Sequence, residues 1–203
     1  MKRQAELRRA DLASDPLEQF RRWFAEAGAV LEVPEAMALA TAAPNGAPSV
    51  RMVLLKGFDA RGLVFYSHYT SRKGRELEAN PQAALLFHWS PLGRQVRVEG
   101  SVKRLPGDES DAYFETRPRA AQLGALASRQ SEPLGSRAGL DERLAAVEGD
   151  LAGDSVPRPP TWGGFLLVPA AWEFWQHRAS RLHDRFCYER EPSGGWRVER
   201  LFP

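Results

Sequence analysis

The sequence predicts an α+β fold in which most of the chain forms antiparallel strands. Short apolar stretches recur along the chain, and turn-forming residues separate them, as at residues 44–48 and 59–62. Strands joined by such tight turns pair antiparallel. Segments with helical periodicity lie between groups of strands, so we expect them as peripheral helices around a sheet.

Length and apolar content set the size of the fold. With 203 residues, of which 43% are hydrophobic, the chain can bury one sizeable core and is too short to require two. We therefore expect a single domain over residues 1–203, in which residues 1–14 form a flexible N-terminal segment. No apolar run approaches the length of a membrane span, so we expect no membrane association.

Charge and cysteine content exclude several classes of protein. The net charge is only +2, too small for a global field that gathers nucleic acid or acidic lipid, so we expect no nucleic-acid partner. The single cysteine, Cys187, excludes an intramolecular disulfide, and no His/Cys set has the spacing of a metal site. We expect a cytoplasmic protein without a metal. The absence of a glycine-rich nucleotide fingerprint argues against a nicotinamide enzyme.

Residues 50–56 form the segment around which we expect the site to be built. The run is aliphatic and β-branched with a cation near each end, which is typical of a buried strand. Arg51 and Lys56 are an odd number of positions apart, so on a strand they leave on opposite faces and can serve two anionic groups. A surface strand whose ends reach solvent is the alternative.

The other elements follow from local patterns. Asp15 and Pro16 begin a helix that Gly28 ends, because a capping residue precedes proline and an apolar stripe follows. Strict alternation marks residues 94–100 as a strand, and Gly100 as a bulge or corner. We expect further helices over residues 108–117, 119–128 and 140–147, a loop over 153–160, and strands over 36–43, 63–66, 82–89, 164–168, 172–175, 182–188 and 196–201.

A further helix begins at Thr70 or Ser71 and ends before Pro81. Its first turn carries Arg72 and Lys73, although the helix dipole favours negative charge there. An anion bound at this end explains the arrangement, and a solvated basic turn is the alternative. Two residues further along the chain also fit an anion, since Tyr113 and Arg117 are four positions apart and share a helix face, although an ordinary surface pair has the same spacing.

A dense polar cluster follows Trp175 near the end of the chain. On a strand over residues 182–188, with Arg181 just before it, Arg181, His183 and Arg185 share one face and Asp184 points away. Such a cluster between aromatic strands is difficult to bury without a ligand. Of the four histidines only His183 lies beside other candidate chemistry, and a lone histidine is more often structural.

Nine motifs in chain order carry a resemblance to a known family. They are residues 51–56 (Arg-Met-Val-Leu-Leu-Lys), 71–73, 94–96, 113–114 with 117–118, 128–131 (Ser-Arg-Gln-Ser), 162–164 (Trp-Gly-Gly), 173–176, 181–185 (Arg-Leu-His-Asp-Arg) and 200–203. Together they resemble the pyridoxine/pyridoxamine 5'-phosphate oxidase family, and the resemblance extends from about Leu7 to the end. It implies an FMN-binding, Greek-key-like split β-barrel with peripheral helices, working as a homodimer with FMN at the interface.

The resemblance also implies which residues bind each ligand. The FMN set is Arg51, Met52, Val53, Leu54, Leu55, Lys56, Tyr66, Ser67, Arg72, Lys73, Gln95, Gln130, Ser131, Trp175 and Arg185. The substrate set is Lys56, Tyr113, Arg117, Arg181 and His183, and of these Arg181 and His183 are implied as catalytic.

The implied reaction is removal of a hydride from pyridoxamine or pyridoxine 5'-phosphate by FMN, with O2 reoxidising the flavin to give H2O2. Arg51, Arg72 and Lys73 would hold the FMN phosphate, which explains the basic helix start. Arg181 and His183 would orient the substrate ring so that its C4' carbon faces flavin N5.

Three positions depart from the family pattern. Ala121 stands where a serine usually completes the substrate phosphate cradle, a loss of one hydrogen bond worth about 1 kcal/mol. Upstream of Leu7 the Arg-x-x-Tyr segment that covers the active site in relatives is missing. Val33 replaces a common acidic residue before Pro34.

Two other functions remain open at this point. Related phenazine-biosynthesis oxidases share the FMN motifs but usually lack the substrate phosphate residues, which this chain keeps as Lys56, Tyr113 and Arg117. A non-catalytic split-barrel protein that stores or senses flavin or a B6 vitamer has no need of Arg181 and His183 at a reacting carbon.

Overall fold

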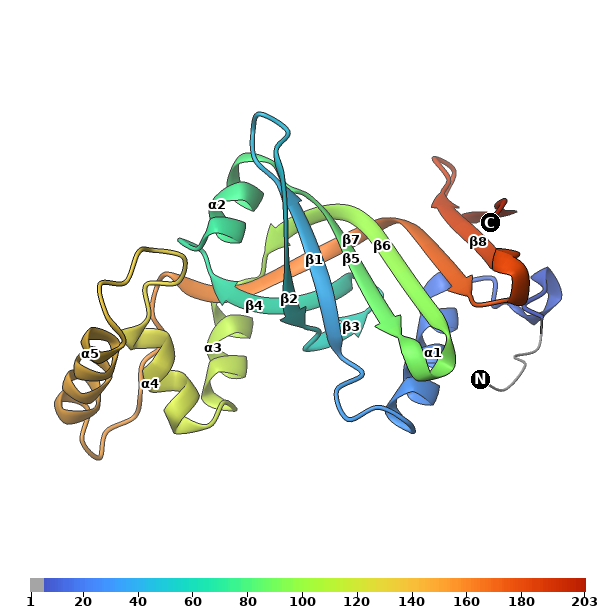
Figure 1. Ribbon diagram of the computed structural model, residues 1–203. Helices are drawn as coiled ribbons and strands as arrows, with labels where there is room; N and C mark the ends of the chain where they lie inside the picture. Colours follow the sequence, from blue (N-terminus) through green and yellow to red (C-terminus); the bar gives the residue numbers. More distant parts are fainter. Residues whose placement is uncertain (1–5) are drawn as a thin grey trace.

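The computed structural model describes residues 6–203 of the chain, and its centre is a single curled sheet (Figure 1). Every strand pair in this sheet is antiparallel, as predicted. The order is β2-β1-β5-β6-β7-β4-β3, with β8 pairing to β7 and β9 to β8. The strands are β1 (Ala36–Ala42), β2 (Pro48–Leu54), β3 (Gly57–Asp59), β4 (Gly62–His68), β5 (Gln82–Trp89), β6 (Arg94–Arg104), β7 (Trp162–Gln176), β8 (Asp184–Arg190) and β9 (Trp196–Arg200).

The helices lie at the two ends of this sheet. Figure 1 shows α3, α4 and α5 gathered at one end, and α1 with β8 at the other. None of the helices in the described part of the chain is long and apolar enough to cross a membrane. The helices are α1 (Pro16–Gly28), α2 (Arg72–Ala79), α3 (Gly107–Glu115), α4 (Arg119–Ala127) and α5 (Arg137–Asp150).

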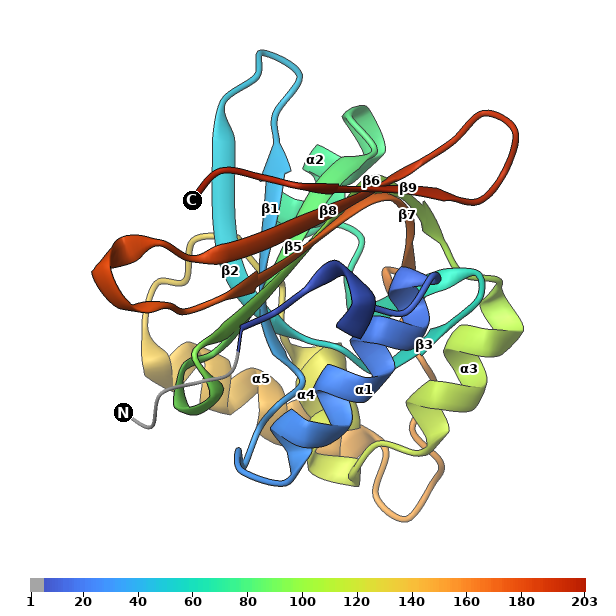
Figure 2. The ribbon, with the colours of Figure 1, turned by 90° about the vertical axis from the view of Figure 1, so that its right-hand side faces the viewer.

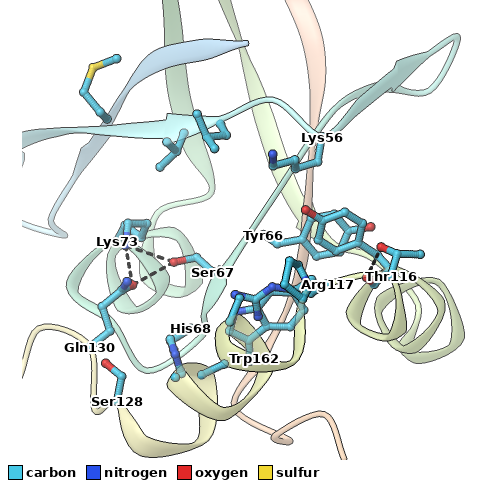
Figure 3. Close-up of a pocket in the computed structure, with 18 residues that line it drawn as sticks. Lys56, Tyr66, Ser67, His68, Lys73, Thr116, Arg117, Ser128, Gln130 and Trp162 are labelled. Carbon is cyan, nitrogen blue, oxygen red and sulfur yellow. Dashed lines mark hydrogen bonds between the residues drawn. The ribbon is translucent and has the colours of Figure 1, made fainter. Parts of the chain in front are cut away.

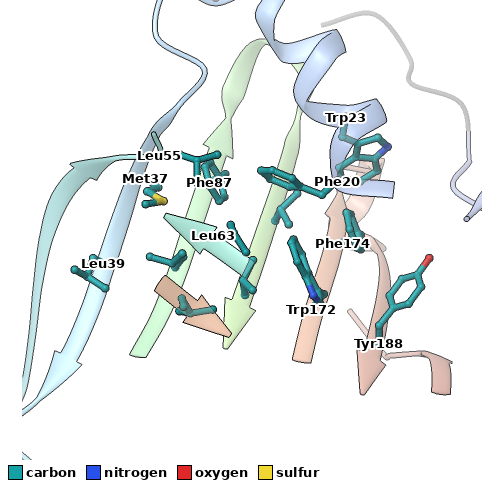
Figure 4. Close-up of a cluster of buried hydrophobic side chains, with 14 of the residues drawn as sticks. Phe20, Trp23, Met37, Leu39, Leu55, Leu63, Phe87, Trp172, Phe174 and Tyr188 are labelled. Atoms are coloured by element: carbon teal, nitrogen blue, oxygen red, sulfur yellow. The ribbon is translucent and has the colours of Figure 1, made fainter. Parts of the chain in front are cut away.

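The α1 helix closes the main core and has the predicted boundaries. The Asp15 carboxylate accepts a hydrogen bond from the Leu17 N–H at 3.0 Å, which satisfies a helix-end donor, and Pro16 needs no such partner. Phe20 is fully buried, and its ring lies 5.0 Å from Phe87 and 5.4 Å from Trp172 (Figure 4). The predicted aromatic stripe of this helix therefore packs into the core.

The long strand β7 runs through a bulge where the sequence suggested two separate strands. Pro169 and Ala170 interrupt the apolar pattern, but pairing with β6 continues past them because the register shifts between Glu99 and Gly100. A Cβ added to Gly100 would lie 2.0 Å from the Val168 carbonyl oxygen, so only glycine fits. The predicted bulge at Gly100 is confirmed, and it lets one strand run from one end of the molecule to the other.

The strand β2 is an edge strand, so the prediction that residues 50–56 are buried is wrong for a single chain. Val50 is 69% exposed, Met52 65% and Leu54 40%, all on one face. Lys56 lies beyond the end of the strand, so the alternation argument for opposite faces does not apply to it. A strand with an exposed apolar face is typical of a surface that another protein chain covers.

The segment before α1 packs against β8, which differs from the predicted flexible segment over residues 1–14. The Leu7 N–H donates to the Asp184 carboxylate at 3.1 Å, and the Tyr188 hydroxyl donates to the Ala13 carbonyl at 2.8 Å. Leu7 and Leu12 belong to the main core. Figure 2 shows this segment lying with α1 beside β8. The remainder of the predicted segment, residues 1–5, lies outside the described residues.

Candidate active site

A cavity of about 690 Å³ opens between the end of β2, the strand β4 and the helices α3 and α4 (Figure 3). Much of the site predicted from sequence lies on its wall. The residues of the predicted ligand sets on the wall are Met52, Val53, Leu54, Lys56, Tyr66, Ser67, Lys73, Tyr113, Arg117 and Gln130. The wall also contains Ala121, noted above as a departure from the family pattern, and the motif residues Pro118, Ser128 and Trp162. The wall residues that the sequence analysis did not connect with the site are His68, Thr116, Gly124 and Ala125.

Lys73 is a buried cation at the base of this cavity. Only 7% of the residue is exposed, and its Nζ donates to Gln130 Oε1 at 2.7 Å and to Ser67 Oγ at 3.1 Å (Figure 3). Both partners are neutral. Burial, with a smaller contribution from Arg51, lowers the pKa of Lys73 to about 8. A lysine held in this way is stabilised by an anion, because burying a charge without a counter-charge is costly.

Arg117 is a second cation, held on an aromatic wall at the other side of the cavity. Its guanidinium lies 4.6 Å from the Trp162 ring and 5.5 Å from the Phe114 ring. Its Nη1 is buried without a hydrogen-bond partner in the described structure, and burial lowers the pKa of the group. Tyr66 and Tyr113 stack beside it with ring centroids 3.8 Å apart. Arg117 and Tyr113 therefore line one cavity, but they do not share a helix face as the spacing predicted, because α3 ends at Glu115.

The cavity as a whole is positively charged. Lys56, Lys73 and Arg117 line it, and no carboxylate occurs among the described residues of its wall. The pKa of His68 is lowered by burial and then by Lys73 and Arg117, which favours the neutral form of its ring. Two separated cations with aromatic walls suit a ligand, or a pair of ligands, carrying phosphate and planar rings.

Arg51 and Arg72 have a counter-charge that the sequence analysis missed. Both bind the buried carboxylate of Glu76, Arg51 Nη2 at 3.3 Å and Arg72 Nε at 2.8 Å. Burial acts to raise the pKa of Glu76, but hydrogen bonds from Ser49, Thr41 and the two arginines outweigh it and lower the pKa to about 2. The signal in the sequence was the i,i+4 spacing of Arg72 and Glu76. Neither arginine lies on the cavity wall.

A second group of predicted residues lies at the opposite end of β7. Gln95 pairs in register with Trp175, and the Trp175 ring lies 4.6 Å from His183. Arg185 binds Glu173 through two hydrogen bonds of 2.8 and 3.1 Å. β7 has 15 residues, which corresponds to about 45 Å of extended chain. One chain therefore does not bring this group to the cavity, whose wall contains the start of β7 at Trp162.

The prediction that Arg181 and His183 share a strand face is wrong. β8 begins only at Asp184, and Arg181 ends a short 3₁₀ helix (Ala179–Arg181) with a positive φ of 62°. The strand pattern failed here because the left-handed backbone turns the chain before the strand starts.

Two further predicted residues lie apart from both groups. The Leu55 side chain is in the main core. Ser131 is exposed, with a φ of 76°. Among the described residues no group of His, Cys, Asp or Glu could hold a metal ion.

Two family models match the chain. Residues 24–149 match the model described as pyridoxamine 5'-phosphate oxidase, and residues 162–203 match the pyridoxine 5'-phosphate oxidase C-terminal dimerisation region. The chain is 59% identical over 204 residues to the pyridoxine/pyridoxamine 5'-phosphate oxidase of Rubrobacter xylanophilus, covering 98% of this chain and 94% of that one. The chain belongs to the pyridoxamine 5'-phosphate oxidase family.

Other relatives of the family agree. The Salinibacter ruber pyridoxine/pyridoxamine 5'-phosphate oxidase is 56% identical over 202 residues, covering 98% of this chain and 94% of its own. PhzG from Burkholderia lata, solved with tetrahydrophenazine-1-carboxylic acid, superposes with a TM-score of 0.90 at 36% identity and covers 96% of this chain and 95% of its own. A pyridoxamine 5'-phosphate oxidase-related FMN-binding protein from Nostoc punctiforme has the same fold, with a TM-score of 0.74 at 19% identity, over 93% of this chain and 98% of that one.

Membership settles several predictions made from the sequence. The resemblance, the split-barrel fold and the oxidoreductase class are confirmed, and FMN is the cofactor of this flavoprotein family. The match of residues 162–203 to a dimerisation region supports the predicted homodimer. The roles of individual residues stay predictions.

Proposed function

We propose that the protein oxidises pyridoxamine 5'-phosphate and pyridoxine 5'-phosphate to pyridoxal 5'-phosphate, as a step of vitamin B6 salvage or biosynthesis. Oxygen accepts the electrons and leaves as H2O2, and the amine substrate also releases ammonia. The observation that carries this proposal is the pair of separated cations, Lys73 and Arg117, in one cavity whose described wall lacks a carboxylate. A phosphorylated cofactor and a phosphorylated substrate need two such cations.

The residues in and beside the cavity fit FMN and a B6 phosphate side by side. Lys73, Arg51 and Arg72 would hold the FMN phosphate at the start of α2, with Ser67 and Gln130 as further polar contacts. Arg117, Lys56 and Tyr113 would hold the substrate phosphate. Bound FMN supplies the capacity to accept a hydride, and the protein supplies orientation and charge.

We propose that the group at the far end of β7 reaches this cavity from the partner subunit. Gln95, Trp175 and Arg185 belong to the predicted FMN set but lie away from the cavity of their own chain. The exposed apolar face of β2, with Val50, Met52 and Leu54, borders the cavity and would be covered by the partner. FMN would then lie at the interface, and the interface would exclude water from the reacting atoms.

In this arrangement each side chain has a physical task. Arg117 and Lys56 bind the substrate phosphate and so fix one end of the molecule. Arg181 and His183 from the partner orient the ring, and Arg185, which Glu173 holds in place, serves as an oriented hydrogen-bond donor on the cofactor side. Glu76 holds Arg51 and Arg72 in place, since both guanidinium groups bind its two oxygens.

The PhzG-like alternative rests on the 36% identity to that oxidase, whose crystallised ligand is tetrahydrophenazine-1-carboxylic acid. The name of that ligand contains no phosphate. Arg117 with its unpartnered Nη1 and the nearby Lys56 favour the phosphorylated substrate. The cytoplasmic location and the single domain over residues 1–203 remain part of the proposal.

The test is to record the visible spectrum of the purified protein before and after pyridoxamine 5'-phosphate is added. We expect a flavin spectrum that bleaches on anaerobic addition of the substrate and returns under air with oxygen uptake. Unphosphorylated pyridoxamine is the control, and it should require a far higher concentration. A flavin that neither a B6 phosphate nor a reduced phenazine carboxylate bleaches would identify a carrier. Bleaching by the reduced phenazine carboxylate alone would identify the PhzG-like function.

A further inference from the structure

The ring of His183 has a defined hydrogen-bond partner in the described structure. The Arg178 backbone N–H donates to His183 Nδ1 at 3.1 Å. A ring nitrogen that accepts a hydrogen bond carries no proton, so the neutral imidazole carries its proton on Nε2. This contact therefore selects one of the two tautomers of His183.

The backbone that supplies this N–H is fixed from several sides. Ser180 and Arg181 have φ values of 58° and 62°, a left-handed conformation that persists only where the surroundings hold it. The Leu182 N–H donates to the Ala179 carbonyl at 3.2 Å and closes the turn. Arg178 Nε lies 3.6 Å from Asp184 Oδ2.

Asp184 is itself buried and anchored. Its carboxylate accepts the Leu7 N–H at 3.1 Å, and its other oxygen binds Arg200. The segment before α1 and the last strand thus hold the carboxylate that binds Arg178. Because Asp184 is held by Leu7 and Arg200 and in turn binds Arg178, these contacts fix the Arg178 backbone N–H where it donates to His183 Nδ1.

Most of the surroundings of the His183 ring lower its pKa. Burial lowers the pKa of His183 first, and His177 and Arg181 lower it further, while Asp184 acts against them. The His177 ring lies 5.2 Å away and the Trp175 ring 4.6 Å away. Arg200 and Pro203 line a hollow together with His183. A proton on Nδ1 would also face the Arg178 N–H, so the neutral ring is favoured.

We propose that His183 acts in the reaction as a hydrogen-bond donor through Nε2, in a tautomer set by the Arg178 backbone, and does not accept a proton from the substrate. This role rests on the proposed function, because it needs a substrate acceptor at the ring. A neutral imidazole with Nδ1 engaged and Nε2 protonated has no free lone pair for a proton. The group then orients the substrate and stabilises charge on its acceptor atom.

The tautomer is tested directly by nitrogen NMR of flavin-loaded protein labelled with ¹⁵N-histidine. The His183→Gln variant identifies the His183 signals among the four histidines. We expect an unprotonated Nδ1 and a protonated Nε2 at pH 7. A protonated Nδ1 would overturn the proposal. This readout needs no turnover, so it stands or falls separately from the proposed function.

The chemical role is tested by the rate of anaerobic flavin bleaching at saturating pyridoxamine 5'-phosphate. Glutamine keeps an N–H donor at the reach of Nε2 but is no base. We expect His183→Gln to lose less than about tenfold and His183→Ala to lose more, whereas loss of a general base costs roughly 10²- to 10⁴-fold.

The matched control for this rate is His177→Gln, which changes the neighbouring ring. The flavin of this variant should bleach at the wild-type rate. If the bleaching rate fell equally, by 100-fold or more, in His183→Gln and His183→Ala, His183 would be a general base. If both variants bleached at the wild-type rate, His183 would have no part in the reaction. Either result overturns the proposal. Absence of bleaching in the wild type as well would refute the proposed function instead.

Discussion

The two ends of β7 both carry clusters of cations, but the clusters differ in how their charges are balanced. At the start of the strand, Lys73 is held by the neutral groups of Ser67 and Gln130, and Arg117 lies on aromatic rings. At the far end, Arg185 is bound by Glu173 through two hydrogen bonds. Lys73 and Arg117 therefore carry positive charge that a ligand can satisfy, whereas the charge of Arg185 is already balanced within its own chain.

This difference indicates that the two groups of cations have different tasks, one in attracting an anionic ligand and the other in orienting it. A cation without a carboxylate destabilises the empty site and strengthens the binding of an anion. A cation bound by a buried carboxylate keeps its place and its orientation, but it offers little net charge to a phosphate. We therefore assign the net charge that attracts a phosphate to Lys73 and Arg117 at the cavity end, where Arg51 and Arg72, already bound by Glu76, add oriented hydrogen-bond donors. We assign orientation of the ligand rings to the Trp175 end. The following predictions test that division, beginning with the largest expected effect.

The two ends need two subunits, so a charge on the exposed face of β2 should abolish function. Val50 is 69% exposed and lies outside the predicted ligand sets, so Val50→Asp places a carboxylate in the proposed interface without touching a ligand. We expect a monomer by sedimentation velocity, with loss of bound FMN. Val30→Asp is the control, because Val30 is 54% exposed and follows α1. A Val50→Asp dimer with full flavin content would refute the shared site.

At the balanced end, removal of the carboxylate should destabilise the fold. Glu173 is 7% exposed and binds Arg185 and Arg97, the latter at 2.8 Å. Glu173→Gln leaves both cations without a buried partner, so we expect the free energy of unfolding in urea to fall by about 3 kcal/mol. Glu99→Gln is the control, since Glu99 binds the same Arg97 at 2.8 Å but is half exposed, and it should cost less than about 1 kcal/mol. If both variants lost the same free energy of unfolding, the buried balance of charge proposed for the Trp175 end would be contradicted.

At the unbalanced end, removal of the cation should stabilise the flavin-free protein and weaken FMN binding. Lys73→Met keeps the length of the side chain and removes its charge. We expect a gain of about 1 to 3 kcal/mol in the free energy of unfolding at pH 7. The affinity for FMN, measured by quenching of flavin fluorescence, should fall about ten- to hundredfold.

The pH dependence of this gain has a definite sign. The pKa of Lys73 is lowered from 10.5 to about 8, so the cost of its charge is present below pH 8 and disappears as the pH rises towards 10.5. The stability difference between Lys73→Met and the wild type should shrink over the same interval. Lys103→Met, at an exposed position, is the control and should change neither quantity. A Lys73→Met protein less stable than wild type would show that the lysine is structural.

The smallest effect is expected at Ala121, which lies on the cavity wall. Ala121→Ser restores a hydroxyl near Arg117, and one added hydrogen bond of about 1 kcal/mol should lower KM for pyridoxamine 5'-phosphate roughly fivefold. The kcat should not change, because the contact is made equally in the ground state and the transition state. Ala120→Ser, on the exposed side of the same helix, is the control. An unchanged KM would mean that another group already makes this hydrogen bond to the substrate phosphate.

Local signals allowed much of the fold to be predicted. The boundaries of α1 followed from Asp15 and Pro16, and Ser71 caps α2 where a start at Thr70 or Ser71 was expected. These predictions succeeded because a cap depends on three or four neighbouring residues. The bulge at Gly100 was also visible, since glycine in a strand marks a close approach of backbone.

The failures came from contacts between distant segments. Glu76 meets Arg51 across 25 positions of sequence, and no local pattern indicates such a pair. The continuity of β7 depends on pairing with β6, which overrides Pro169. The left-handed turn at Arg181 is held by Asp184 and the segment near Leu7, so a strand pattern could not reveal it. The expected single domain over residues 1–203 stays a prediction.

The length of β7 has a consequence for inheritance. In the proposed dimer each active site takes the start of β7 from one chain and the end of β7 from the other. A chain defective at Lys73 and a chain defective at His183 would each have reduced activity alone. Their mixed dimer would carry both lesions in one site and none in the other, so a cell with both alleles would recover part of its enzyme activity, whereas two alleles altered at the same end would not complement each other.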